Sequence, residues 1–297
     1  MINFNGKIIP KTALQLSNDN RAFKYGDAIF ETVRVLNTKV VFMEDHYFRL
    51  MASMRMLRMK IPMKFTLEFL QEEILKVTNE LPKSLNYRVR LTVYRKDGGL
   101  YNPTSNDIDY LIEASEFHPI EKTSYKIDLY KDFYNYSGLL STIKTTNRML
   151  NTLSAVFADE NDLDNCILLN ERKGVVEATN GNIFVIKDGV IKTPALTEGC
   201  IKGVTRKKVL EILEKHPNYT VEETVISPFE LQKADEIFIT NAIIGIQSVT
   251  NYRKKVFTSE ITNKIKSSLK LLAITWLIHL NIAWCICPNF IFTTFLK

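Results

Sequence analysis

The sequence predicts an α+β protein built from two domains. Its 297 residues are about twice the usual length of a single domain. Apolar residues make up 45% and charged residues 24% of the chain, a balance that can bury a sizeable core. In each half, strand-like runs joined by hairpin turns are followed by amphipathic helices, without the regular βαβ alternation of a doubly wound sheet.

The first domain is expected over residues 1–118. Its predicted elements are, in chain order, strand runs within 1–9, a hairpin over 27–46, helices over 46–59 and 66–81, and strands over 86–95 and 109–117. The hairpin is predicted because runs rich in Val, Ile and Phe flank Asn37-Thr38. The helices carry apolar residues at helical spacing. The run 86–95 alternates, which places Arg88 and Arg90 on one face of the strand.

The second domain is expected over residues 119–270, beginning in a polar linker. Its predicted strands lie at 126–133, 166–171, 182–188, 235–243 and 247–257, and its predicted helices at 148–162, at 205–215 and from Ser259 onward. Turns at Lys173-Gly174 and Asp188-Gly189 separate the apolar runs. These boundaries follow changes between alternating and helical hydrophobic spacing.

The segment 271–297 departs from this pattern. Between Leu271 and Leu296 there is no Asp, Glu, Lys or Arg, and the stretch is long enough for a membrane span. His279, Asn281 and Pro288 interrupt it. A membrane anchor, a tail packed on the body or on a dimer, and a divergent C-terminus without function are the three alternatives.

The charge and cysteine content exclude several classes of protein. A net charge of +6, without a concentrated basic stripe, does not predict nucleic-acid binding. Four cysteines without a CxxC pair indicate a reducing compartment, and the N-terminus lacks a secretory signal, so a cytoplasmic location is expected. The four histidines have no metal-ligand spacing, so no metal site is expected.

A group of polar residues around Glu177 carries the strongest functional signal. A carboxylate ends one strand, an Asn-rich entrance opens the next, and a Gly-containing turn leads into the helix at residue 205. Backbone amides of Gly203, Val204 and Thr205 at that helix N-terminus would form a phosphate site. The same pattern is also typical of a capped helix with a solvated glutamate on a loop.

The segment 177–206 resembles the signature of the class IV aminotransferases, the fold-type IV pyridoxal 5′-phosphate (PLP) enzymes. Further similarity lies in YGDAIFETVR at 25–34, HYFRLMAS at 46–53 and IKTTNRMLN at 143–151. The resemblance extends from the first strand to about residue 266. It implies a two-domain fold like that of D-amino-acid aminotransferase, with the cofactor between the domains.

The resemblance also implies roles for individual residues. It assigns PLP attachment to Lys144, the contact with the pyridine nitrogen to Glu177, and phosphate binding to Arg49, Val204 and Thr205, with a further phosphate or substrate contact at Thr240 or Asn241. A carboxylate opposite the ring nitrogen keeps that nitrogen protonated, so that the ring accepts electrons from the substrate Cα. A neutral Lys144 amine would then move the Cα proton.

Local sequence favours one reaction within the family. Lys144-Thr-Thr-Asn147-Arg148, the stretch 239–242 and the Gly-rich loop 95–103 are similar to 4-amino-4-deoxychorismate lyases. Phe30 replaces the tyrosine of D-amino-acid aminotransferases. The leading hypothesis is therefore a lyase that forms 4-aminobenzoate and pyruvate for folate synthesis.

The substrate of that lyase is anionic, so its carboxylates would need cationic partners. The candidates for these contacts are Arg88, Arg90 and Arg95. The alternative is a branched-chain-type amino-acid aminotransferase that uses 2-oxoglutarate, because a few pocket contacts decide specificity. A non-catalytic binder of anions is a third interpretation, which the residues around Lys144 disfavour. The resemblance further implies a homodimer.

Overall fold

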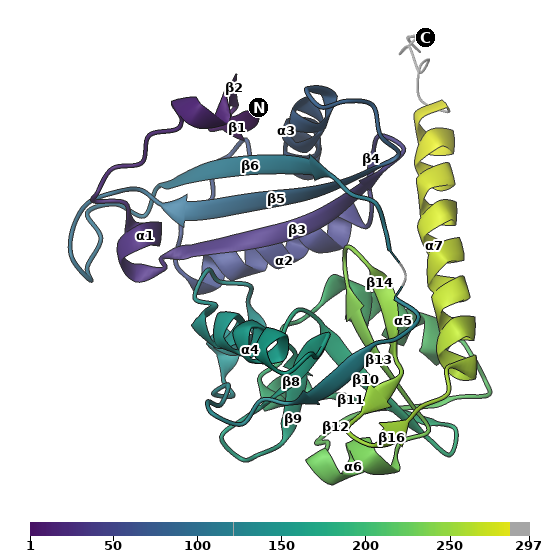
Figure 1. Cartoon of the computed structure of the whole chain (residues 1–297). Coiled ribbons are helices and arrows are strands. Elements are labelled where there is room, and N and C mark those ends of the chain that lie inside the picture. The colour runs from purple at the N-terminus through teal and green to yellow at the C-terminus, as the bar shows by residue number, and fades with distance from the viewer. Residues whose placement is uncertain (121, 286–297) are drawn as a thin grey trace, which may run out of the picture.

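The computed structural model describes residues 1–120 and 122–285 (Figure 1). Strands up to Glu116 form one six-stranded sheet, and strands from Lys126 onward form two five-stranded sheets. Helices pack on these sheets, so the predicted α+β class is confirmed. The boundary between residues 118 and 119 stays a prediction.

The first half is an antiparallel sheet with two long helices on one face. The strands are β1 Ile2–Phe4, β2 Lys7–Ile9, β3 Ala28–Leu36, β4 Lys39–Val40, β5 Asn86–Arg95 and β6 Ile108–Glu116, and the helices are α1 Arg21–Tyr25, α2 Met43–Met56 and α3 Leu67–Asn79, with a 3-10 turn at Lys11–Ala13. The strand order is β2-β1-β6-β5-β3-β4. Met54 of α2 and Ile74 of α3 pack into one buried cluster with Val89 and Ile112 of the sheet.

Two details of this half differ from the prediction. Helix α2 begins three residues earlier than expected and ends at Met56, because Arg58 adopts a left-handed conformation (φ 56°) that stops the helix. The short helix α1 was not predicted. Asn20 caps it by accepting a hydrogen bond from the Phe23 N–H, which is a typical N-cap contact.

Within its described residues, the second half contains two sheets and four helices. The strands are β7 Lys126–Leu129, β8 Asn165–Leu169, β9 Val175–Ala178, β10 Asn182–Lys187, β11 Val190–Pro194, β12 Thr220–Thr224, β13 Glu236–Asn241, β14 Gly245–Val249, β15 Asn251–Tyr252 and β16 Lys255–Val256. The helices are α4 Met149–Glu160, α5 Val204–Glu214, α6 Pro228–Lys233 and α7 Glu260–Cys285, with 3-10 turns at Leu139–Thr142 and Leu196–Glu198. The sheets have the orders β12-β11-β10-β13-β14 and β16-β15-β7-β8-β9.

Several elements of this half depart from the predicted pattern, among them β11, which was not predicted. The expected strand 247–257 is divided among β14, β15 and β16, with Arg253 in a left-handed turn (φ 55°). Strand β12 was missed because its sequence is polar and it lies at a sheet edge. Helix α6 was also missed, although Ser227 and Glu230 form a capping box around it.

Helix α7 extends beyond the expected end of the body, through the first residues of the apolar segment 271–297. Leu272 and Ala273 pack on the buried cluster that contains Leu269 and residues of α5 and β14. No helix in the described part of the chain is long and apolar enough to cross a membrane. The rest of the tail prediction, from residue 286, lies outside the described residues.

The two halves share a hydrophobic cluster. Val41 and Phe42, which follow β4, pack with Phe184, Phe238 and Ile246 of the second half. Nearby, Asp45 at the start of α2 forms ion pairs with Lys207 and Lys208 of α5. These contacts hold β3 and β5 opposite β9, β10 and the start of α5, and the functional cavity lies between them.

Candidate active site

A cavity of about 530 Å³ lies between the two halves. Of the twelve candidate residues from the sequence, all except Arg95 line it: Phe30, Arg49, Arg88, Arg90, Lys144, Glu177, Gly203, Val204, Thr205, Thr240 and Asn241. They come from segments far apart in the chain. Folding therefore gathers the predicted cluster into one site.

The backbone around Lys144 is attached to the edge of β3. The Phe30 N–H donates to the Lys144 carbonyl (2.8 Å), and the Thr146 N–H donates to the Ala28 carbonyl (3.0 Å). Asn147 lies against Gly26, where a Cβ atom would come within 2.1 Å of the amide oxygen of Asn147. Gly26 also has φ 61°, a left-handed conformation that glycine adopts readily. The loop is thus fixed on both sides of the lysine.

The Lys144 amine lies in a positively charged environment. Its Nζ atom is 4.3 Å from the centre of the Phe30 ring. Burial, together with the nearby guanidiniums of Arg49 and Arg148, lowers the pKa of Lys144 to about 8, although Glu31 and Glu177 oppose the shift. A substantial fraction of this amine is therefore neutral slightly above neutral pH.

Glu177 lies near the end of β9 with its side chain almost fully buried. Its Oε2 atom accepts a hydrogen bond from the Ile201 N–H (2.9 Å). Burial raises the pKa of Glu177, while the Ile201 N–H and the charges of Arg148 and Lys144 act in the opposite direction. The carboxyl group also lines the cavity, so it can accept a hydrogen bond from a bound ligand.

Arg49 projects from α2 and is held by Glu31. Its Nε and Nη2 atoms donate to the two carboxylate oxygens of Glu31 (2.7 and 2.5 Å). His46 contacts the same carboxylate through Nδ1 (2.7 Å). Burial alone would raise the pKa of Glu31, but the charge of Arg49 and the His46 contact hold it at about 2. Glu31 is therefore an anion that orients Arg49.

The start of α5 forms a cradle opposite Arg49. Arg49 Nη1 donates to the carbonyl of Lys202 (2.9 Å), next to Gly203. No side chain caps this helix among the described residues. A Cβ atom on Gly203 would lie 2.0 Å from Asn182 Oδ1, so any larger residue there would displace the Asn182 side chain, which donates to the Ile201 carbonyl. Amide N–H groups at an uncapped helix N-terminus form a site for an anion.

Thr240 adds an observation that points to a ligand. Its side chain is 1% exposed and lines the cavity, and its Oγ1 atom has no hydrogen-bond partner in the described structure. A buried hydroxyl without a partner is costly. The cradle, the unpaired hydroxyl and Arg49 are a donor set that fits the phosphate group of PLP, while Lys144 and Glu177 fit its carbonyl carbon and ring nitrogen.

Arg88 and Arg90 share one face of β5 and line the cavity, as their alternation predicted. The guanidinium carbon of Arg90 lies 3.7 Å from the centre of the Phe30 ring, and Arg90 Nε donates to Thr92 Oγ1 (3.2 Å). Neither arginine forms an ion pair within the part of the chain that the structure describes. Both are placed to bind an anionic group of a ligand.

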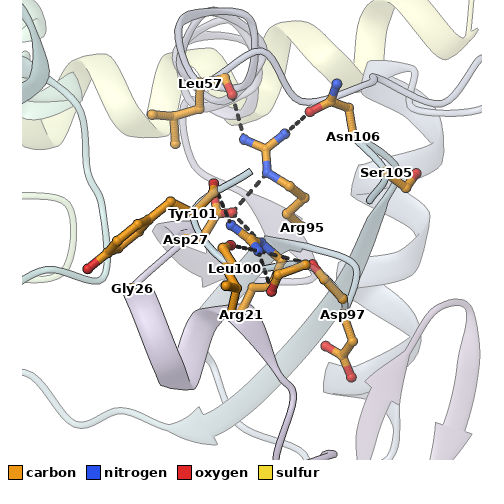
Figure 2. A network of polar contacts seen from close by, with 12 residues as sticks. Arg21, Gly26, Asp27, Leu57, Arg95, Asp97, Leu100, Tyr101, Ser105 and Asn106 are labelled. Carbon is orange, nitrogen blue, oxygen red and sulfur yellow. Dashed lines mark hydrogen bonds and ion pairs between the residues drawn. The ribbon is translucent and has the colours of Figure 1, made fainter. Parts of the chain in front are cut away.

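Arg95 does not belong to this site. Figure 2 shows its guanidinium surrounded by Asp27, Asn106 and Leu57. Nε donates to Asp27 Oδ2 (2.9 Å), Nη2 donates to the Leu57 carbonyl (2.7 Å), and Nη1 donates to Asn106. Arg95 is out of phase with Arg90 on the strand, so it points to the face that carries Val93 and the core. The expectation that it binds substrate is corrected.

Arg148 is the main cavity residue that was not among the candidates. Its Nε and Nη2 atoms donate to the carbonyls of Thr145 (3.0 Å) and Ile143 (2.9 Å), and its side chain lines the cavity. Other lining residues without a predicted role are Thr32, Phe117, Asn151, Thr179, Asn180, Gly181, Asn182, Ile201, Ala242, Ile243 and Ile244. Its place only four residues after Lys144 in the sequence could have identified Arg148 as a candidate.

Comparisons with known proteins agree with this geometry. The sequence model of a family described as "Amino-transferase class IV" matches residues 28–252. The chain is 29% identical over 286 residues to a "Putative branched-chain-amino-acid aminotransferase" of Methanocaldococcus jannaschii, covering 93% of this chain and 97% of the relative. It is 24% identical to the aminodeoxychorismate lyase of Vibrio harveyi, covering 82% and 88%.

Solved structures show the same fold. A branched-chain aminotransferase of Thermoproteus uzoniensis with norvaline superposes with a TM-score of 0.85 at 22% identity, covering 92% of this chain and 94% of that one. A branched-chain amino acid aminotransferase of Thermobaculum terrenum in its PLP form superposes with a TM-score of 0.80 at 20% identity, covering 92% and 93%. The fold inferred from the resemblance is thus confirmed.

Proposed function

Because this chain belongs to the class IV aminotransferase family, whose members use PLP, we propose that it is a PLP-dependent aminotransferase of the branched-chain type. It would transfer the amino group of an aliphatic amino acid to 2-oxoglutarate. The observation that carries the enzyme assignment is the Lys144 amine, which faces the cavity with a lowered pKa near Glu177. The choice of an aminotransferase rests on the relatives.

The relatives reverse the order of the two hypotheses from the sequence. Motifs around Lys144 favoured the lyase, but the relative with 29% identity over 93% of the chain carries a branched-chain aminotransferase name. The lyase relative is more distant, at 24% identity. The cavity also suits an aminotransferase, because apolar Phe30, Phe117 and Ile243 line it together with the guanidiniums of Arg88 and Arg90. Such a wall accepts first an aliphatic amino acid and then a dicarboxylate.

The residues of the cavity would have different roles in the reaction. When bound, PLP supplies an electron sink for the negative charge that develops at the substrate Cα. Arg49, the amides of Gly203 to Thr205 and the Thr240 hydroxyl would hold its phosphate, and Glu177 would keep the ring nitrogen protonated. The neutral Lys144 amine removes the proton from the substrate Cα and returns a proton during product formation. Arg90 and Arg88 orient the substrate carboxylates.

The test compares two reactions in one preparation. The purified holoenzyme is incubated with leucine and 2-oxoglutarate, and glutamate formation is measured. In parallel, pyruvate release from 4-amino-4-deoxychorismate is measured. We expect glutamate formation that is lost in Lys144→Ala. Pyruvate release without glutamate formation would overturn the aminotransferase assignment in favour of the lyase.

The lyase remains a second candidate because of one specific feature. Besides Arg49, which is held by Glu31, the guanidiniums of Arg88, Arg90 and Arg148 line the cavity, which is enough cationic charge for a substrate with two carboxylate groups. Release of pyruvate from the aromatising ring would require Lys144 to act first as base and then as acid. The paired assay above separates the two reactions without further variants.

We also propose a homodimer that acts in the cytoplasm. Phe23 is 83% exposed and Tyr101 is 90% exposed, and they lie on α1 and on the neighbouring loop that Arg21 holds in place. Exposed aromatic side chains of this kind favour a protein interface. Cys166 and Cys200 are both free and buried, which agrees with a reducing compartment. The molar mass from light scattering coupled to size-exclusion chromatography tests the dimer, and fractionation of cells tests the location.

A further inference from the structure

Arg148 makes an unusual pair of contacts around the proposed catalytic lysine. Its Nε atom donates to the carbonyl of Thr145 (3.0 Å), and its Nη2 atom donates to the carbonyl of Ile143 (2.9 Å). One planar guanidinium therefore binds the backbone on both sides of Lys144. Two hydrogen bonds from a rigid fork restrict a loop more than two separate donors do.

The stability of helix α4 does not explain an arginine at this position. Arg148 is the N-cap residue of α4, and its side chain does not cap the helix. A positive charge at a helix N-terminus is opposed by the helix dipole, and Ser, Thr, Asp or Asn would be preferred there. The guanidinium instead turns back to the segment that carries Lys144.

The same side chain also borders the cavity. Arg148 lines it together with Lys144 and Glu177, and its Nη1 atom takes no part in the two loop contacts. Burial and the charges of Arg49 and Arg148 are the causes that lower the pKa of Lys144. Because a guanidinium stays protonated in proteins, the charge of Arg148 does not depend on pH in the working range.

We propose that Arg148 is a positioning residue that fixes the backbone on both sides of Lys144 and keeps a permanent positive charge beside its amine. This one side chain thus has two functions, a mechanical one and an electrostatic one. The reason for these two functions rests on the proposed reaction, since proton transfer at the substrate Cα needs a neutral and well-placed amine. Both functions are measurable without substrate.

The electrostatic function is tested with Arg148→Met and Arg148→Lys. The full-length chain, freed of cofactor by dialysis against hydroxylamine, which carries the cofactor away as its oxime, and then against buffer, is labelled with acetic anhydride over a range of pH, and acetylation of Lys144 is measured by mass spectrometry. In Arg148→Met we expect the labelling midpoint to rise by about one pH unit, as removal of a nearby like charge predicts. In Arg148→Lys the charge is kept, and the midpoint stays within about 0.3 unit of the wild-type value.

The mechanical function is tested by hydrogen exchange in the same proteins. The Phe30 amide donates to the Lys144 carbonyl, so its exchange reports whether the loop stays on β3. We expect exchange at Phe30 to accelerate by at least about tenfold in both variants, because a lysine does not present a rigid fork to two carbonyls. Arg148→Lys thus separates the two functions: it restores the midpoint and not the protection.

Arg88→Met is the matched control. Arg88 also lines the cavity but is not among the causes of the shift at Lys144, so both readouts should match wild type. An unchanged midpoint in Arg148→Met would overturn the electrostatic function, and unchanged Phe30 exchange in Arg148→Lys would overturn the mechanical one. If Arg148→Met does not fold, a midpoint in Arg148→Lys displaced by a full unit contradicts the electrostatic function. An inactive wild-type enzyme with these shifts intact would instead count against the proposed reaction.

Discussion

Arg90 and Arg95 lie on the same strand, β5, but their guanidiniums have opposite surroundings. Arg95 is 7% exposed and has a carboxylate, a carbonyl and an amide oxygen as partners for its three nitrogens. Arg90 faces the cavity, where its Nε atom donates to Thr92 and its guanidinium lies over the Phe30 ring, and it forms no ion pair in the described structure. The same residue type therefore serves two purposes within one strand.

The difference separates a structural network from a binding site. Around Asp27, the positive charges of Arg21 and Arg95 are neutralised by the protein itself (Figure 2). Around Lys144, the positive charges of Arg90, Arg148 and the lysine exceed the nearby carboxylates. Charges that are buried and paired stabilise the fold once formed, while uncompensated charges cost stability until an anion binds. The two regions should thus respond to mutation with opposite signs.

The largest expected effect is a loss of stability in Arg95→Met. Removing this guanidinium weakens the pairing of Asp27 and leaves the Leu57 carbonyl and Asn106 without their donor, at a cost of about 3–5 kcal/mol. Urea denaturation measures the free energy of unfolding. The control is Arg55→Met, the same substitution at an exposed position of α2. A stable Arg95→Met enzyme with a raised KM would instead place Arg95 in the substrate site.

The next effect has the opposite sign and is a gain of stability in Lys144→Met. The pKa of Lys144 is about 8 in the folded chain and near its ordinary 10.5 when unfolded, so the unfolded chain holds the proton more tightly. The charged lysine therefore costs stability below pH 8, on the order of 3 kcal/mol, and the cost disappears as the pH rises toward 10.5.

We expect cofactor-free Lys144→Met to be more stable than wild type at pH 7 and equally stable near pH 10.5. Unfolding of both chains in urea is followed at several pH values. The control is Lys76→Met, which removes an exposed lysine paired with Glu73 and should not raise stability at any pH. A Lys144→Met chain that is less stable than wild type at pH 7 would contradict the view of the cavity as uncompensated charge.

A smaller effect is expected for Arg90→Met, and it should appear in binding. A charge-assisted hydrogen bond to a carboxylate contributes about 1.5–3 kcal/mol, so the KM for 2-oxoglutarate should rise about 10- to 100-fold. The free energy of unfolding should change by less than about 1 kcal/mol. Steady-state kinetics and urea denaturation measure the two quantities. A large loss of stability with an unchanged KM would show that Arg90, like Arg95, supports the fold and does not bind substrate.

The smallest effect is expected for Thr240→Val, which removes the unpaired buried hydroxyl and keeps the shape. The cofactor-free protein should gain about 1 kcal/mol of stability, because a buried hydroxyl without a partner is lost. PLP affinity should fall by up to about tenfold, as measured by fluorescence titration. Thr193→Val is the control, since the Thr193 hydroxyl is buried and does donate to the Ile183 carbonyl (2.8 Å), so that variant should lose stability.

Much of the architecture was predictable because its elements have strong local signals. The hairpin around Asn37-Thr38 is present as β3 and β4, and the predicted second helix begins directly after Thr66, whose side chain caps it. Alternation along β5 placed Arg88 and Arg90 on the cavity face, and the same rule would have excluded Arg95. Strand β12 was not predictable, because a short polar edge strand has no distinguishing periodicity.

The sequence predicted which residues line the candidate site, but it did not predict their ion pairs and hydrogen bonds. The resemblance identified Lys144, Glu177 and Arg49, and folding brings all three to one cavity. Sequence spacing could not reveal that Glu31 orients Arg49, because the two lie on different elements. It also could not reveal Arg148 as a contact of the loop, since that depends on a side chain turning back from the start of α4.

The uncompensated charge around Lys144 belongs, we propose, to a PLP site with this lysine as the point of attachment. The direct measurement is borohydride reduction of the purified, PLP-loaded protein, followed by digestion and mass spectrometry. We predict one phosphopyridoxyl adduct per chain, on the peptide that contains Lys144, and its absence in Lys144→Ala. Adducts spread over surface lysines, or no adduct in a protein that is folded and exposed to PLP, would contradict the account.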